Sequence, residues 1–416
     1  MTTTIHWFRR DLRLADNSSL AAAIEGGSVV PVYIHAPDEE APWQPGGASR
    51  WWLHHSLAAL DASLRALGSR LVIRRGPGSA ALETLIRETG ASEVHWNRLY
   101  EPAIVARDTA IKAGLSDIGV IAESHAGHLL FEPWTVRNGS GDPYRVFTPF
   151  WRNCTPRLDS LAPPRPAPSS LPAVPPGIQG EALESLGLLP RIRWADGLAA
   201  AWTPGEDGAA AEIDRFTNAA ITDYKAHRDR PDLAGTSRLS PHLHFGEVSP
   251  GQVIATVHAA SQVPRPAGFT TGAESFIREL GWREFGHHLL YHFPHTTDEP
   301  LDARFAGLEW RDEPESLRRW QRGQTGIPIV DAGMRELWHT GWMHNRVRMI
   351  VASLLTKNLF TRWQHGARWF WDTLVDADLA NNTAGWQWTA GTGADAAPYY
   401  RVFSPLLQAE RFDPER

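Results

Sequence analysis

The chain has 416 residues, a formal net charge of −6 and 42% hydrophobic residues. This length predicts two domains, and the composition is that of a globular protein. The single cysteine, Cys154, excludes a disulfide framework and an iron–sulfur cluster held by four cysteines. No apolar run is long enough to span a membrane, and residues 1–10 lack the apolar core of a signal peptide, so we expect a cytoplasmic protein.

Short apolar segments alternate with helical patterns up to about residue 130. We expect strands at 3–9, 29–34, 71–73, 93–96 and 120–122, and helices at 18–24, 51–67, 80–88 and 103–113. This alternation predicts an α/β domain over residues 1–130 with a parallel, doubly wound sheet. Ligands of such sheets sit at the carboxyl ends of the strands. No Gly-x-Gly-x-x-Gly follows the first strand, which argues against a dinucleotide site there.

The remainder divides into a connector and a helical region. Residues 131–200 are expected to form the connector, because 161–177 are dense in Pro, Ala and Ser. From 201 to 416 the patterns are helical, and the run from Thr340 is expected to open a long amphipathic helix with a core stripe of Val347, Ile350, Val351, Leu354 and Leu355. Within that region, 311–371 hold ten basic and five acidic residues, a surplus of five positive charges. The surplus permits a basic face on an acidic protein, although an ordinary solvated helix surface has the same composition.

Residues 376–388 combine two carboxylates, two asparagine amides and two indoles. Aromatic and small residues make close walls, and carboxylates and amides hold ring edges and hydroxyl groups, so the mixture indicates a pocket for a large flat ligand. The alternative is a buried turn with a satisfied polar network. A second polar and aromatic run follows at 391–401.

These two runs resemble a known signature. Asp-x-Asp-Leu-Ala-x-Asn from Asp376, Gly-Trp-Gln-Trp from Gly385 and Gly-Ala-Asp-Ala-Ala-Pro-Tyr from Gly393 resemble the flavin-binding motif of the DNA photolyase and cryptochrome family. The resemblance extends from Thr4 to Pro414. It implies that an all-helical FAD-binding domain follows the α/β domain. Family members continue for several tens of residues beyond this point, so the chain is expected to be either truncated at its C-terminus or a short homologue whose FAD domain lacks its last helices.

The resemblance also implies which residues bind FAD. The run 236–240 resembles the pyrophosphate loop; taken alone, it is an anion site at a helix start or a simple capped turn. Arg348 is expected to pair with Asp376, with Arg283 joining them, and Asn382 to face the flavin. The expected FAD-binding residues are Tyr224, Thr236, Ser237, Arg238, Leu239, Ser240, Phe276, Glu279, Arg283, Asn345, Arg348, Asp376, Asp378 and Asn382.

A further set is expected to meet damaged DNA. On a helix, Glu279, Trp282 and Arg283 share one face, which alone would suit a surface salt bridge beside a core tryptophan. The resemblance makes Glu279 the carboxyl group at the lesion, with Trp282 and Trp388 as opposite walls. The expected catalytic residues are Glu279, Asn345 and Asn382, and the expected DNA-binding residues are Arg228, Glu279, Trp282, Asn345, Arg346, Met349, Trp388 and Arg401.

The kind of lesion follows from two positions. Asn345 and Met349 stand where (6-4) photolyases carry histidines, so the resemblance favours cyclobutane pyrimidine dimers, flipped out of the duplex. We therefore expect a monomeric lyase that repairs such dimers in DNA with blue light and reduced FAD. The alternative is a cryptochrome-like photoreceptor without repair activity. Plant-type cryptochromes commonly have aspartate at the position of Asn382, which favours repair.

Two accessory features are expected. Trp310, Trp363 and Trp386 match the family's tryptophan relay for light-driven flavin reduction, although each suits a core equally well. An antenna chromophore in the α/β domain is left open. Ala103 and Ile104 occupy the places of an Asn-Glu pair that holds folate in one known site, so a folate bound in that manner is not expected, while a deazaflavin, a differently placed folate or no antenna remain. No metal site is expected.

Overall fold

The computed structural model describes residues 2–311, 313–394 and 402–413. Within them, the N-terminal part forms a parallel five-stranded sheet in the order β3-β2-β1-β4-β5. The strands are β1 (Thr3–Phe8), β2 (Ser28–His35), β3 (Val72–Arg75), β4 (Glu93–Asn97) and β5 (Ile121–His125). The central strand β1 is buried from Thr4 to Phe8, as expected when both faces of a sheet are covered. The predicted order of strands and helices is confirmed.

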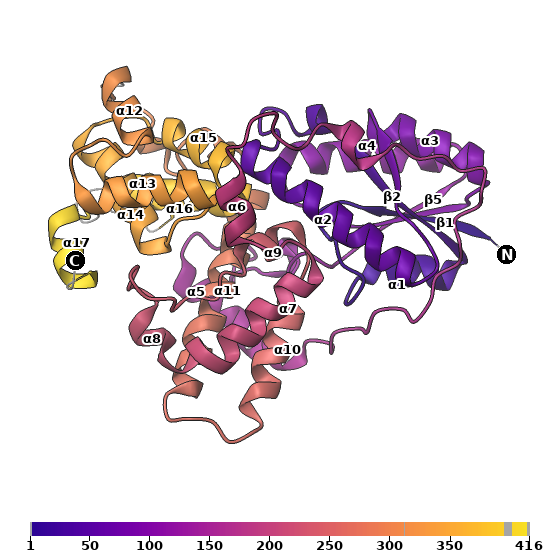
Figure 1. Cartoon of the computed structure of the whole chain (residues 1–416), viewed down its shortest axis with the longest axis horizontal. Helices are drawn as coiled ribbons and strands as arrows, with labels where there is room; N and C mark the ends of the chain where they lie inside the picture. The colour runs from indigo at the N-terminus through magenta and orange to yellow at the C-terminus, as the bar shows by residue number, and fades with distance from the viewer. Residues whose placement is uncertain (1, 312, 395–401, 414–416) are drawn as a thin grey trace.

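Helices cover both faces of this sheet (Figure 1). They are α1 (Ser18–Gly26), α2 (Gly47–Ala66), α3 (Gly78–Thr89) and α4 (Pro102–Asp117). Helices α1 and α2 pack in one apolar cluster through Leu20 and Leu57, and α3 and α4 in another through Leu82 and Ile111. Two separate apolar clusters, each between the sheet and a pair of helices, are typical of a doubly wound arrangement. They confirm the expected fold class.

The segment after the sheet first passes through the helical part and then, around residues 165–181, runs along the outside of the α/β domain (Figure 1). Backbone bonds from Leu171 to Leu67 and from Glu181 to Ile73 fasten it there. It also contains α5 (Phe147–Cys154), whose Phe147 stacks on Trp282 with ring centroids 3.7 Å apart. The expected connector 131–200 therefore includes a helix that belongs to the packing of the helical part.

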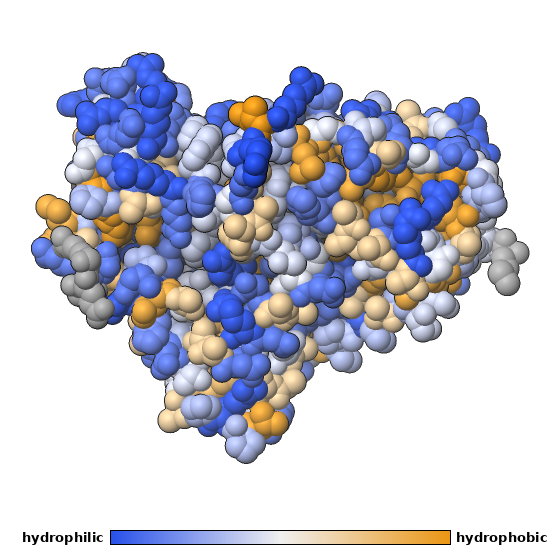
Figure 2. Space-filling model, viewed as in Figure 1, coloured by the Kyte–Doolittle hydropathy of each residue, from blue (hydrophilic) through white to orange (hydrophobic). Residues whose placement is uncertain are grey.

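The C-terminal half is helical. Its helices are α6 (Asp196–Ala201), α7 (Glu206–Arg215), α8 (Tyr224–His227), α9 (Ser240–Phe245), α10 (Pro250–Ser261), α11 (Phe269–His292), α12 (Pro314–Gln321), α13 (Pro328–Thr340), α14 (Asn345–Ser353), α15 (Trp363–Thr373), α16 (Leu379–Ala390) and α17 (Pro405–Phe412). Helix α16 packs against α11, α14 and α15. The surface over α12 is mostly hydrophilic (Figure 2). Among the described residues, no helix is both long and apolar enough to cross a membrane.

One helix begins later than the sequence suggested. The run from Thr340 was expected to open a long helix, but α13 ends at Thr340 and α14 begins at Asn345. Gly341 has a φ of 69°, which favours glycine and ends α13, and the ring of His344 then accepts a hydrogen bond from the Arg346 amide to cap α14. The expected core stripe is confirmed, since Val347, Ile350, Val351, Leu354 and Leu355 are all buried.

Candidate functional site

A cavity of about 410 Å³ lies among α11, α14 and α16. This volume falls within the roughly 300–1,000 Å³ of ligand pockets. Its walls combine rings, amides and charged groups with small residues. The lining includes Arg228, Glu279, Trp282, Gly286, Asn345, Arg346, Arg348, Met349, Asp376, Ala377, Asn381, Asn382, Ala384, Gly385, Trp386 and Trp388. The structure thus brings together seven of the eight side chains expected at the DNA, but only five of the fourteen expected at the flavin.

Arg348 and Asp376 form an ion pair in the wall of this cavity. Arg348 Nη2 lies 2.8 Å and 3.1 Å from the two oxygens of the Asp376 carboxylate, and its Nε donates to the Met343 carbonyl at 2.8 Å. Asp376 is buried just before α16 begins. The expected pairing of these two residues is confirmed, and it leaves a fixed guanidinium and carboxylate beside the space that a ligand would fill.

The expectation that Arg283 joins this pair is wrong. Its Nη1 donates to the His128 carbonyl and its Nη2 to the His128 ring nitrogen, each at 2.9 Å. Glu284 lies 3.5 Å from the same guanidinium. Helical spacing places Arg283 one turn after Glu279, but its long side chain turns to buried acceptors that the α/β domain supplies. Glu279 and Trp282 line the cavity, whereas Arg283 connects α11 to His128 of the α/β domain.

Two ion pairs of partly exposed side chains line the cavity, and we call this part of the lining its mouth. Arg228 donates to Glu279, and Arg346 lies 2.7 Å from Asp229. Burial alone would lower the pKa of Arg228, but Glu279 more than compensates and raises it. Asp229, which the sequence analysis did not single out, comes directly after Arg228, and this adjacency is the signal that could have identified it. The third arginine expected here, Arg401, lies outside the described residues.

Four more expected residues line the same cavity. Asn345 Nδ2 lies 4.0 Å from the sulfur of Met349, one helical turn further along α14. Phe147 stacks on one face of Trp282, and Phe403 stacks on Trp388 with ring centroids 5.9 Å apart. These contacts hold the two indoles as preformed walls of the cavity.

The expected pyrophosphate loop lies apart from the residues that line the cavity. Arg238 has a φ of 54°, and its guanidinium sits over the rings of Trp202 and Trp342, 4.1 Å and 5.4 Å from their centroids. Arg215 donates to the Thr236 carbonyl, and Leu239 is buried. The described residues that line the cavity do not include Ser237, Ser240, Tyr224 or Phe276.

Two of these residues are nevertheless connected to the mouth. Tyr224 is buried with Phe276 edge-on against it, at 5.7 Å between centroids. The guanidinium of Arg228 lies 5.6 Å from the Tyr224 ring centroid. Tyr224, packed against Phe276, therefore supports the guanidinium of Arg228 at the cavity.

Asp378 caps α16 and faces histidines. Its Oδ1 accepts hydrogen bonds from the Asn381 amide and side chain, both at 2.8 Å. Its Oδ2 lies 3.3 Å from His287 Nε2 and 3.7 Å from His244 Nδ1. Burial alone would raise the pKa of Asp378, but these two histidines hold it well below the ordinary value. Neither histidine was anticipated, because nothing in their sequence spacing links them to Asp378.

Asn382 is oriented by the backbone of α15. Its Nδ2 donates to the Ala367 carbonyl at 3.0 Å, so the amide is fixed and its carbonyl oxygen is available to the cavity. Neighbouring small residues leave room for a flat group, since a Cβ added at Gly385 would meet nothing within 4 Å. The buried indole nitrogen of Trp386 has no hydrogen-bond partner. This set of donors, acceptors and small residues fits a flavin ring.

The three tryptophans expected to form a relay lie in or against one apolar cluster. Trp363 and Trp386 are buried in it, and Trp310 packs against it half-buried. Trp386 lines the cavity, so the cluster extends from the cavity to the surface. Trp320, which the sequence analysis did not select, also touches Trp386 edge-on, at 6.1 Å between centroids.

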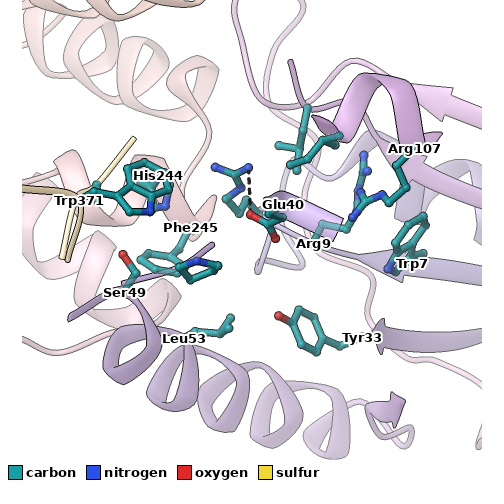
Figure 3. Close-up of a pocket in the computed structure, with 15 residues that line it drawn as sticks. Trp7, Arg9, Tyr33, Glu40, Ser49, Leu53, Arg107, His244, Phe245 and Trp371 are labelled. Atoms are coloured by element: carbon teal, nitrogen blue, oxygen red, sulfur yellow. Dashed lines mark ion pairs between the residues drawn. The ribbon is translucent and has the colours of Figure 1, made fainter. Parts of the chain in front are cut away.

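A smaller cavity lies at the carboxyl ends of the strands, where ligands of such sheets were expected (Figure 3). Trp7 and Arg9 approach it from β1, Tyr33 from β2, and His244 and Trp371 from the helical part. Its volume of about 60 Å³ is well below the roughly 300 Å³ at which ligand pockets begin.

Comparison with known proteins agrees with this geometry. A family described as the FAD-binding domain of DNA photolyase matches residues 276–416, and one described as DNA photolyase matches residues 4–170. A deoxyribodipyrimidine photo-lyase of Agrobacterium fabrum is 49% identical over 98% of this chain and 84% of that protein. Cryptochrome-1 of Arabidopsis thaliana is 38% identical over 99% of this chain and 61% of that protein.

A solved structure is similar over the whole chain. The bacterial class III photolyase from Agrobacterium tumefaciens superimposes with a TM-score of 0.95 and 47% identity, covering 100% of this chain and 85% of that one.

Proposed function

The chain belongs to the DNA photolyase family, and from that premise we propose that it is a deoxyribodipyrimidine photolyase, which repairs cyclobutane pyrimidine dimers in DNA with blue light. FAD, in its reduced form and excited by light, supplies the electron that opens the cyclobutane ring. The residues of this chain bind, orient and shield the reacting groups. The 49% identity to a deoxyribodipyrimidine photo-lyase, against 38% to a cryptochrome, favours repair over photoreception.

The observation that carries the proposal is the make-up of the cavity. Glu279, Asn345 and Trp282 stand at its mouth, while Asp376, Arg348 and Asn382 lie in its walls. We assign the wall residues to the flavin. The fixed Arg348–Asp376 pair would meet polar ring edges, and the Asn382 amide, held by Ala367, would meet the ring system.

We assign the residues at the mouth to the lesion and its strand. Glu279 and Asn345 would hydrogen-bond the flipped bases, with Trp282 and Trp388 stacking on them. Arg228 and Arg346 would exchange their present carboxylate partners for phosphates and so position the strand. Arg401 is assigned to the same role from the sequence alone.

The kind of lesion provides the test. Oligonucleotides carrying either one cyclobutane thymine dimer or one (6-4) product are illuminated with the flavin-loaded, reduced chain. Because Asn345 and Met349 offer no imidazole for proton transfer, we expect recovery of the cyclobutane substrate only. Repair of the (6-4) product, or of neither lesion, would contradict the proposal, and flavin binding without repair would favour a photoreceptor.

A further inference from the structure

A second group of chemically active side chains lies far from the cavity, at the edge of the sheet. His95 is on β4, and Glu123 and His125 are on β5, the outer strand of the sheet. In the register of the two strands, His95 pairs with Glu123, and Asn97 pairs with His125. Alternate residues of a strand point to one face, so all three side chains share a face of the sheet.

The nitrogens of the two imidazoles are already spaced as ligands of one ion. His95 Nδ1 lies 3.1 Å from His125 Nε2. Metal–nitrogen distances near 2.0–2.1 Å in a tetrahedral zinc site put two ligand nitrogens roughly 3.3 Å apart. The Glu123 carboxylate lies 3.9 Å from the same His125 nitrogen, and the three ligand atoms all fall within 4.8 Å of one another.

A fourth residue orients the first histidine. Glu93 Oε2 lies 3.0 Å from His95 Nε2 and accepts a hydrogen bond from its N–H. This tautomer leaves the Nδ1 lone pair of His95 directed at His125. Carboxylates hold metal-binding histidines in this way in many sites. Helix α1 leaves room for Glu93 only because Gly26 lacks a side chain, since a Cβ there would come within 2.6 Å of Glu93 Oε2.

Nearby positive charges lie on the opposite face of the sheet. Lys112 donates to the Ser124 hydroxyl, and Arg98 donates to the same residue. Ser124 lies between Glu123 and His125 in β5 and therefore points away from them. The side chains of His95, His125 and Glu123 are 4%, 20% and 57% exposed, so the group opens to solvent through Glu123.

We propose that His95, His125 and Glu123 bind one divalent cation of the zinc class, with Glu93 as the positioning residue. Two imidazoles and one carboxylate suit zinc and its neighbours in the transition series, whereas magnesium and calcium prefer oxygen ligands. The ion would tie the outer strand β5 to β4. The site is independent of the flavin cavity and of the proposed repair reaction, so either assignment can fail without the other.

The experiment uses the full flavin-loaded chain after removal of metals with a chelator. Zn²⁺ binding is followed by calorimetry, and Co²⁺ binding by the visible absorption of tetrahedral cobalt. We expect one Zn²⁺ per chain. H125Q should remove the cobalt band and weaken Zn²⁺ binding at least about a hundredfold, and E93Q, which acts only through His95, should weaken it roughly 10- to 100-fold. H258Q, at an exposed histidine on α10, should leave binding unchanged.

Flavin absorbance and circular dichroism report whether each variant is folded. If H125Q does not fold, E123Q decides the question, because Glu123 is exposed and its replacement disturbs no core. Zn²⁺ binding that is equal in wild type and E123Q or H125Q would overturn the proposal, as would a wild-type chain that gives no tetrahedral cobalt spectrum. In either case the two imidazoles share only a hydrogen bond.

Discussion

Arg228 donates a hydrogen bond to Glu279 across the mouth of the cavity. The residue expected at the lesion and a residue expected at the phosphates are thus already joined. Arg346 and Asp229 repeat the arrangement at 2.7 Å. Damaged DNA would compete for both arginines, so its binding must include an exchange of carboxylate for phosphate partners.

Replacing Glu279 tests the role of its carboxylate. E279Q keeps the shape but removes the charge and one acceptor, and a hydrogen bond to a charged group contributes about 1.5–3 kcal/mol. We expect repair to slow roughly 10- to 100-fold with flavin content unchanged. The measurements are the repair rate under fixed blue light and the ratio of flavin to protein absorbance.

The control for this change lies on the same helix. Glu274 is exposed on α11 and does not line the cavity, so E274Q should repair normally. A normal rate in E279Q would remove the assigned role, and a loss of flavin would show that Glu279 acts on the cofactor site instead.

Removing Arg348 should weaken flavin retention. R348A leaves the buried carboxylate of Asp376 without its ionic partner. The loss should be about 2 kcal/mol, less than the roughly 3–5 kcal/mol of a fully buried pair, because solvent screens a partly exposed guanidinium. We expect purified R348A to carry less flavin and to melt at a lower temperature, with R348K intermediate. Full flavin content in R348A would contradict the assignment.

The tryptophan cluster makes a kinetic prediction. W310F should slow light-driven reduction of the oxidised flavin, while repair by chemically reduced enzyme stays normal, because the half-buried Trp310 lies at the outer side of the cluster. W338F changes an exposed indole and serves as the control. If W310F photoreduces normally, the route through Trp310 is wrong, and the contact of Trp320 with Trp386 becomes the one to test.

A buried histidine should make the protein sensitive to acid. Burial, followed by the charge of His292, lowers the pKa of His288 from 6.5 to about 3. The unfolded chain therefore binds one more proton than the folded chain between these values. The stability that comes from keeping His288 neutral is fully present above pH 6.5. It is lost as the pH falls toward 3, by roughly 1.4 kcal/mol of unfolding free energy per pH unit.

Urea titrations at several pH values check this. H288Q keeps an acceptor for the Tyr144 amide, which the ring now binds at 3.0 Å, but has no proton to gain. Its unfolding free energy should fall less steeply between pH 6 and pH 4. H258Q, at an exposed position, should keep the wild-type slope. Equal slopes in H288Q and wild type would mean that His288 does not titrate on unfolding.

The sequence predicted most of the fold because the patterns are local. Each strand contains or adjoins a short apolar run between helical patterns, and the core stripe of α14 follows helical spacing. The connector was harder. Helix α5 precedes the Pro-rich stretch 161–177, and its Phe147 stacks on Trp282, a partner more than a hundred residues away that local patterns do not reveal.

Site residues were predicted where a motif fixes them, and less well where distant partners do. Arg348 and Asp376 pair as expected, whereas Arg283 and Asp378 turn to His128 and to His287 and His244. Long or buried charged side chains go to whichever acceptor the fold supplies. His95 and His125 are 30 residues apart on two strands, and only the register of the sheet brings them together.

The most direct test of the proposed function is light-dependent repair by purified protein. The flavin-loaded chain is reduced chemically without oxygen and mixed with a thymine-dimer oligonucleotide, and absorbance at the thymine band is followed under blue light. We expect recovery in the light, none in the dark, and no change with undamaged oligonucleotide. A chain that holds its flavin but restores no absorbance in the light would contradict the repair function.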